Sequence, residues 1–222
     1  MTPAAICLDL DGTLVDSAAG IEWALRAAAA EVLDDGDVGD IGAVIGGRID
    51  AMLAQLLPQL EPDQTAAIVR AFRHHYDGAG WRRSQPYAGV VDTLAALRCA
   101  GIELHIVTNK PAAPTAAVLE LTGLREYFDH VVSPDTPPGS PDKAGALRCL
   151  LAMTGLAPGD VLFVGDTMDD RGAAQANGVP FIGVRYGYGC AGLDAEAARA
   201  GIALIEAIDE LPARLAATPA RA

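Results

Sequence analysis

Short apolar runs recur along the chain and alternate with stretches of helical periodicity. Runs of this length are typical of strands that are buried on both faces, and their alternation with helices indicates βαβ units in a parallel sheet. The runs are 4–10, 102–108, 130–132, 161–165 and 179–184, with a shorter one at 203–205 that predicts an edge strand. The pattern therefore predicts an α/β fold with a Rossmann-like parallel sheet.

The predicted helices between these strands have clear ends. Glycine tolerates the left-handed conformation that closes a helix, so a glycine after the last periodic residue marks a helix end. The helical patterns and their glycines are 90–100 with Gly101, 115–122 with Gly123 and 144–154 with Gly155. Ser140 and Pro141 predict an N-cap and a first-turn proline for the last of these helices.

Residues 17–85 interrupt the alternation, because they show helical periodicity and no strand signal. The helical stretches are 21–32, 44–57 and 65–76. An insertion of this kind directly after the first strand predicts a helical cap domain on an α/β core. The predicted domains are a core of residues 1–16 and 86–222 and a cap of residues 17–85.

Composition and charge narrow the classes of partner. Half of the 222 residues are hydrophobic, which is enough for a sizeable core, and the net charge of −13 argues against nucleic acid or an acidic membrane as a partner. The four cysteines form no CxxC pair and are interpreted as reduced thiols. No signal peptide or membrane-spanning stretch is predicted, so we expect a cytoplasmic protein. We also expect it to be a monomer or a homodimer.

The stretch CLDLDGTLVD places Asp9 and Asp11 at the end of the first predicted strand. Residues i and i+2 of a strand point to the same side, so the two carboxylates would lie close together. Two like charges beside a buried strand are unfavourable unless a cation compensates them. The spacing therefore predicts a cation site at this strand end.

Other polar residues follow the neighbouring strands. Thr108 and Asn109 follow the second strand, Asp166 follows the fourth, and Lys143 begins the helix that leads into the fourth. Ligands of open parallel sheets lie beyond the carboxyl ends of the strands, so these side chains should converge. Carboxylates, a hydroxyl and an ammonium suit Mg²⁺ and a phosphate. One carboxylate could attack phosphorus, and a second could protonate the leaving oxygen and activate water.

Three segments carry a resemblance to the haloacid dehalogenase superfamily, and within it to the phosphoglycolate phosphatase-like branch. DLDGTLVDS resembles the first motif of that superfamily, IVTNKP the second and VGDTMDDRGAAQANGV the fourth. The resemblance implies that Asp9 is the nucleophile and a metal ligand. It implies that Asp11 is the general acid and base and gives its carbonyl to the metal, and that Thr108 binds phosphate with Asn109 as an auxiliary.

The resemblance also implies roles for later residues. Asp166 is the expected carboxyl-side metal ligand, and Asp170 is expected to support the metal site by orienting metal-bound water or Lys143. Many relatives carry the lysine of the third motif in a Lys-Pro pair, which this chain lacks; Lys143 in GSPDK is assigned that role. The implied cofactor is Mg²⁺ and the implied substrate is a small phosphorylated metabolite.

Within the predicted cap, Arg48 follows a glycine pair in VIGGRID and is predicted to bind a substrate carboxylate or second phosphate. Lys110 is placed at the rim of the site and Asp169 in solvent. The pair His74–His75 and the stretch 81–83 are interpreted as cap surface and packing.

Phosphoglycolate is the leading predicted substrate. A β-phosphoglucomutase-like phosphoryl transfer shares the chemistry and stays open. A receiver-type signalling module that accepts a phosphoryl group is the alternative from another class of protein.

Overall fold

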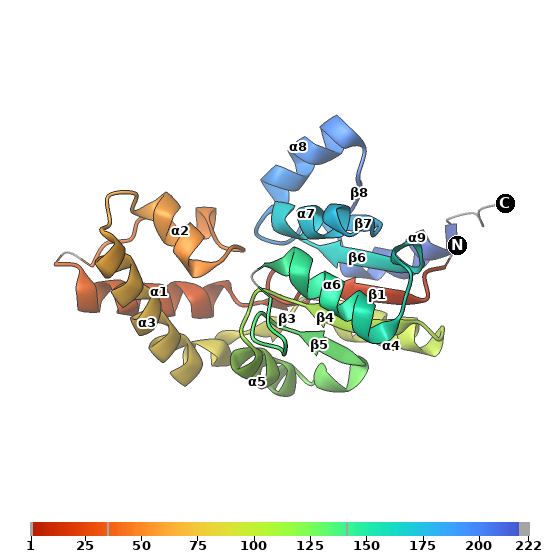
Figure 1. Ribbon diagram of the computed structural model, residues 1–222, viewed down its shortest axis with the longest axis horizontal. Helices are drawn as coiled ribbons and strands as arrows, with labels where there is room; N and C mark the ends of the chain where they lie inside the picture. Colours follow the sequence, from red (N-terminus) through yellow and green to blue (C-terminus); the bar gives the residue numbers. More distant parts are fainter. Residues whose placement is uncertain (1, 35, 141, 218–222) are drawn as a thin grey trace.

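The computed structural model describes residues 2–34, 36–140 and 142–217 (Figure 1). Within these residues, six strands form one sheet in the order β5-β4-β1-β6-β7-β8, and every neighbouring pair is parallel. The strands are β1 (Ala5–Leu8), β4 (Glu103–Val107), β5 (His130–Val132), β6 (Val161–Gly165), β7 (Phe181–Val184) and β8 (Ala203–Ile205). The predicted Rossmann-like parallel sheet is confirmed.

Helices cover both faces of the sheet. They are α4 (Val90–Cys99), α5 (Ala112–Thr122), α6 (Lys143–Thr154), α7 (Met168–Ala176), α8 (Cys190–Ala200) and α9 (Leu211–Ala217). Ile6 and Leu8 of β1 pack in one buried cluster with α4, α5 and α9. Ala5 and Cys7 pack in another cluster with α6 and α7. Successive residues of β1 therefore enter opposite cores, which is why its sequence is a continuous apolar run.

Predicted helix starts are less accurate than predicted helix ends. The helices that begin at Ala18, Pro62 and Ala112 each begin three residues earlier than predicted, and two further starts differ in other ways. α6 begins at Lys143, and its N-cap is Asp142, whose carboxylate accepts from the Gly145 N–H at 2.7 Å. Ser140 instead donates its hydroxyl to the Asp142 carbonyl, and Pro141 lies outside the described residues. The helix predicted from residue 44 begins only at Ile49. The predicted helix ends at Gly101, Gly123 and Gly155 are confirmed, since all three have positive φ.

The segment between β2 (Val15–Asp16) and β3 (Gln85–Pro86) is helical, with α1 (Ala18–Val32), α2 (Ile49–Leu56) and α3 (Pro62–Gly78). These helices lie to one side of the sheet (Figure 1). Their buried cluster draws its buried members only from residues 21–76, so the insertion has an apolar core of its own. β2 and β3 pair antiparallel, with Val15 opposite Pro86 and Asp16 opposite Gln85. The chain thus leaves and rejoins the core at one place.

Short 3₁₀ helices complete the described elements. They are η1 (Ile41–Ala43), η2 (Gly80–Arg83), η3 (Arg125–Tyr127), η4 (Pro158–Asp160) and η5 (Ile208–Glu210). Between η1 and α2, Gly46 has φ 114° and breaks the helical pattern, because few other residues adopt this conformation. A Cβ at Gly46 would lie 3.1 Å from a Thr167 side-chain carbon, so this loop of the insertion runs close to the core.

Candidate active site

The polar residues that follow three neighbouring strands converge at the carboxyl edge of the sheet. Asp9 follows β1, Thr108 follows β4 and Asp166 follows β6, and all three are buried. The strand β1 lies between β4 and β6, so its last residues occupy the centre of this edge. The structure therefore brings together the strand-end residues that the sequence predicted to converge.

Lys143 reaches this edge from the first turn of α6. Its ammonium lies 3.0 Å from Asp9 Oδ1 and 2.6 Å from Asp170 Oδ1, and its side chain is almost fully buried. Burial alone would lower the pKa of Lys143, but Asp170 and Asp9 outweigh it, so the pKa is raised above its usual value. Lys143 is therefore a permanent cation beside Asp9.

Asp170, in the first turn of α7, forms an ion pair with the Lys143 ammonium. Its Oδ1 accepts from Lys143, while its Oδ2 accepts from the backbone N–H of Thr167 at 2.9 Å and from its hydroxyl at 2.7 Å. The Thr167 hydroxyl in turn accepts from the Asp170 N–H, which completes a capping box. The contacts of Asp170 thus favour the positioning of Lys143 over the orientation of a metal-bound water.

The acidic cluster suits a divalent cation. Oxygens of Asp9, Asp166 and Asp170 lie within 4.8 Å of one another, and all three residues are buried. One buried oxygen of Asp9, Oδ1, has no hydrogen-bond partner among the described residues, although Lys143 forms an ion pair with it. Burial, and next Asp170, raise the pKa of Asp166 to about 7. Three carboxylates against one ammonium leave negative charge that Mg²⁺ would offset, so the residues fit this metal.

Neighbouring groups fix the orientation of Asp166. The hydroxyl of Thr13 donates to its Oδ1 at 3.1 Å, and the backbone N–H of Tyr188 donates to its Oδ2 at 2.8 Å. Gly12 lies so close that a Cβ there would clash with the Asp166 carboxylate, and its φ is 86°. Glycine is thus required at this position of the DGT sequence by both space and conformation.

Asp11 points to a different partner. Both of its carboxylate oxygens accept from the ammonium of Lys110, at 2.8 and 2.7 Å, and this ammonium lies 4.5 Å from the centre of the Tyr76 ring. Lys110, predicted to lie at the rim of the site, is buried and lines the cavity. Its stem extends inward from the loop after β4 to reach Asp11. The predicted metal contact of the Asp11 carbonyl stays a prediction.

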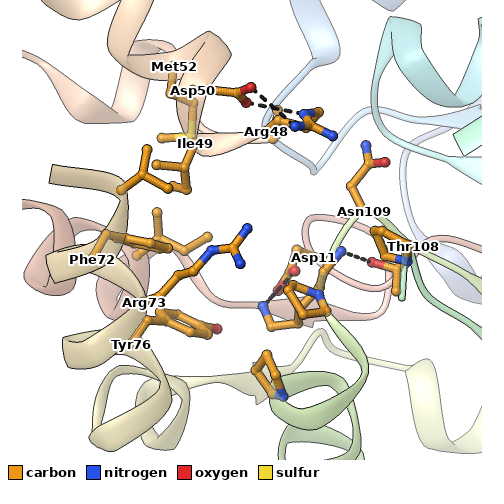
Figure 2. A pocket seen from close by; sticks show the side chains of 18 of the residues that line it. Asp11, Arg48, Ile49, Asp50, Met52, Phe72, Arg73, Tyr76, Thr108 and Asn109 are labelled. Atoms are coloured by element: carbon orange, nitrogen blue, oxygen red, sulfur yellow. Dashed lines mark hydrogen bonds and ion pairs between the residues drawn. The ribbon is translucent and has the colours of Figure 1, made fainter. Parts of the chain in front are cut away.

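A cavity of about 240 Å³ joins these core residues to the insertion. Figure 2 shows Arg48 and Ile49 from the α2 region and Phe72, Arg73 and Tyr76 from α3 around it. Its core lining includes Asp9, Asp11, Thr108, Asn109, Lys110 and Lys143. Arg48 forms a two-point ion pair with Asp50, with both N···O distances 3.2 Å. The side-chain amide of Asn109 donates to Asp169, at 2.6 Å, so Asp169 is not merely a solvated residue.

Sequence reasoning missed five residues of the site. Thr13 lies within the first motif, DLDGTLVDS, and Tyr188 lies in the loop after β7, but their residue types gave no signal for contacts with Asp166. Phe72, Arg73 and Tyr76 share one face of α3, where helical spacing is the usual pattern of simple packing. Only the structure, in which they line the cavity together with Asp9 and Asp11, shows what they surround.

Comparison with known proteins decides the family. The model of the haloacid dehalogenase-like hydrolase family matches residues 6–184. The chain belongs to this family. It is 38% identical to "Phosphoglycolate phosphatase, plasmid" of Cupriavidus necator, over 98% of this chain and 94% of that protein. It is 39% identical to "Phosphoglycolate phosphatase" of Photobacterium profundum, over 82% and 83% of the two chains.

Solved structures of several proteins share the fold. The protein SP0104 of Streptococcus pneumoniae, of the haloacid dehalogenase-like hydrolase family, has a TM-score of 0.85 at 25% identity, covering 96% of this chain and 98% of that one. The Protein Tyrosine Kinase A of Mycobacterium tuberculosis has a TM-score of 0.81 at 29% identity, with the same coverage. One fold therefore carries differently named activities, and the reaction must be argued from the site.

These matches confirm the predicted family. Because the matching family is one of hydrolases, they do not support the alternative of a receiver-type signalling module. The names of these relatives agree with the predicted class of phosphoric monoester hydrolase. Among the described residues, no helix is long and apolar enough to span a membrane.

Proposed function

We propose that the protein is a Mg²⁺-dependent phosphatase of small phosphorylated metabolites in the cytoplasm, with phosphoglycolate as the leading substrate. The observation that carries this proposal is Asp9. It lines the cavity, lies 3.0 Å from the Lys143 ammonium, and has a buried oxygen with no hydrogen-bond partner among the described residues. A carboxylate oxygen that is not engaged in a hydrogen bond is a suitable nucleophile for a phosphoryl group that Lys143 attracts. The names of the curated relatives support phosphoglycolate.

The proposed reaction has two displacements at phosphorus. A carboxylate oxygen of Asp9 attacks the phosphoryl group, the ester bond breaks, and Asp11 gives a proton to the departing oxygen. Asp11 then takes a proton from water, which attacks the aspartyl-phosphate and releases inorganic phosphate. Because Lys110 donates to both oxygens of Asp11, Asp11 must leave this ion pair before it can serve the leaving group.

The remaining core residues bind and neutralise the phosphoryl group. Thr108 and Asn109 lie on the cavity wall, where a hydroxyl and an amide can donate to phosphate oxygens, and Lys143 adds a positive charge. Mg²⁺, held by Asp9, Asp166 and the Asp11 carbonyl, would supply further positive charge against the phosphate oxygens. Asp170 keeps Lys143 in place.

Residues 17–85 are proposed to act as a cap domain. Their separate apolar core and the single place where the chain crosses to the sheet support a unit that can move over the site. Closure would exclude bulk water during phosphoryl transfer, and opening would release products. Arg48, on the cavity wall, is the residue that the sequence assigned to substrate binding.

Hydrolysis of p-nitrophenyl phosphate tests the reaction class. Turnover should require Mg²⁺, stop on chelation with EDTA and resume when Mg²⁺ is restored. Asp9→Asn should abolish turnover, because an amide cannot attack phosphorus, and it should leave the melting temperature the same or higher, because one clustered negative charge is lost.

Residual activity above about a hundredth of the wild-type rate would contradict the role of Asp9, since that loss corresponds to only about 2.7 kcal/mol of barrier. Full activity in metal-free buffer would remove Mg²⁺ from the proposal. Phosphate released to water from phosphoglycolate, with no transfer to an added sugar phosphate, separates a phosphatase from a β-phosphoglucomutase-like enzyme.

A further inference from the structure

Positive side chains line the cavity from both sides. Within the described residues they are Lys143 and Lys110 from the core and Arg48 and Arg73 from the insertion. Lys143 is paired with Asp9 and Asp170, Lys110 with Asp11, and Arg48 with Asp50. A cation whose charge is already balanced by a carboxylate gains less from binding another anion.

Arg73 differs from the other three cations. It forms no ion pair within 4.0 Å and no hydrogen bond among the described residues, and Figure 2 shows its guanidinium directed from α3 into the cavity. Asp77, one helical turn further along, also lines the cavity. Burial raises the pKa of Asp77 and Arg73 acts in the opposite direction, so the two residues interact without forming a close pair.

Arg73 is exposed, so its guanidinium is accessible to an anion that enters the cavity. The insertion side of the cavity is largely apolar, with Ile21, Ile49, Met52, Val69 and Phe72 in its lining. Charges interact more strongly beside apolar walls than in open water, and a guanidinium can donate two parallel hydrogen bonds to one carboxylate. The opposite side holds Asp9 and Lys143, where the phosphoryl group is proposed to bind. The cavity thus offers one anion site on the core and a second on the insertion.

We propose that Arg73 is the specificity-determining residue that binds a substrate carboxylate, and that Arg48 is not. This inference rests on the proposed phosphatase function, and it limits the substrate class to short phosphomonoesters that carry a carboxylate. It moves the role that the sequence suggested for Arg48 to a residue on another helix. Arg48 stays on the cavity wall, tied to Asp50.

A matched pair of substrates isolates the carboxylate. Phosphoglycolate and ethyl phosphate differ by a carboxylate in place of a methyl group, so the change in the ratio of their kcat/KM values between variants measures recognition of that group. The wild-type enzyme should prefer phosphoglycolate. Arg73→Met should lower this preference by about tenfold or more through the KM of phosphoglycolate, and it should leave ethyl phosphate turnover unchanged.

Arg48→Met is the matched control, because it removes the other cap guanidinium from the same cavity. It should keep most of the preference. Arg73→Lys should restore part of it, since a lysine keeps the charge but not the two-point geometry. Thermal melting of each variant, expected within a few degrees of the wild type, shows that the fold is kept.

Three results would overturn the inference: a wild-type enzyme without preference for the carboxylate, a preference that survives Arg73→Met, or a preference lost in Arg48→Met alone. Equal losses on both substrates in Arg73→Met would also overturn it, because they would show that Arg73 acts through folding or closure of the insertion. Failure of the proposed function appears differently, as the absence of Mg²⁺-dependent turnover of ethyl phosphate and p-nitrophenyl phosphate by the wild-type enzyme.

Discussion

Asp166 links the protonation of one carboxyl group to metal binding. Its pKa is raised to about 7, mainly by burial and secondly by the negative charge of Asp170. In an unfolded chain the pKa of an aspartate is about 3.9. Between these values the folded state binds more protons than the unfolded state. For this group, the free energy of unfolding of the metal-free protein should therefore fall as pH rises from about 4 to about 7.

Mg²⁺ should oppose this loss, because it binds the deprotonated carboxylate. At a concentration about a hundredfold above its Kd, the metal adds about 2.7 kcal/mol of stability, which raises the Tm of a chain of this size by about 5–10 °C. Melting curves with EDTA or Mg²⁺ should show this rise at pH 8 and a clearly smaller one at pH 5. An equal rise at both pH values, or a rise retained in Asp166→Asn, would contradict the assignment.

The residues of the site differ in how far sequence could predict them. Asp9, Thr108 and Asp166 lie at the ends of apolar runs, and the rule that ligands lie beyond parallel strand ends was enough to bring them together. The contacts of Lys110 could not be predicted, because the direction of a long side chain depends on where its partners Asp11 and Tyr76 lie. Arg73 could not be found, since it is an exposed charged residue on an amphipathic helix, and most such residues bind no ligand.

At the scale of elements, Tyr188 connects three parts of the chain. From the loop between β7 and α8, its hydroxyl accepts from the Ser17 N–H at 2.7 Å and donates to Asp16 at 3.1 Å, while its own N–H holds Asp166. Ser17 is buried, so Tyr188→Phe would leave its N–H without this partner. The change should lower the free energy of unfolding by about 1–3 kcal/mol.

Urea denaturation measures this cost as a lower midpoint at an unchanged m-value. Tyr127→Phe is a suitable control, because within the described residues the Tyr127 hydroxyl has no hydrogen bond that the change would remove. An unchanged midpoint for Tyr188→Phe would show that its hydroxyl bonds do not stabilise the start of α1.

Strands and helix ends were predictable where a single feature of the sequence determined them. The continuous apolar runs located the six strands of the parallel sheet, and terminal glycines located three helix ends. Helix starts were less predictable: Asp142 caps α6 in place of Ser140, and Gly46 delays the start of α2. The two-residue strands β2 and β3 carry no periodicity, and they exist only because distant segments meet.

For the whole molecule, the separate apolar clusters predict that the core folds without the insertion. The two clusters around the sheet take all their buried members from outside residues 17–85. A chain in which a short Gly-Ser turn replaces residues 18–83 should therefore unfold in one cooperative transition. It should still hydrolyse p-nitrophenyl phosphate, more slowly because water reaches the site, and its preference for phosphoglycolate over ethyl phosphate should be lost.

Circular dichroism during thermal melting and the same two kinetic ratios test this shortened chain. A broad, non-cooperative melt would contradict the independence of the core. A retained preference for the carboxylate would locate recognition in the core and not in the insertion.

The pairing of β2 with β3 also limits how the insertion can move. Both connections run side by side, tied at Val15 with Pro86 and at Asp16 with Gln85, and the Tyr87 N–H adds a bond to the Leu14 carbonyl. Two connections fastened together allow rotation about one shared axis but resist sliding. The opening motion proposed for the insertion would, about such an axis, also withdraw Arg48 and Arg73 from the cavity. Release of the organic product and loss of its recognition would then be one event, with no closed state from which the product could depart.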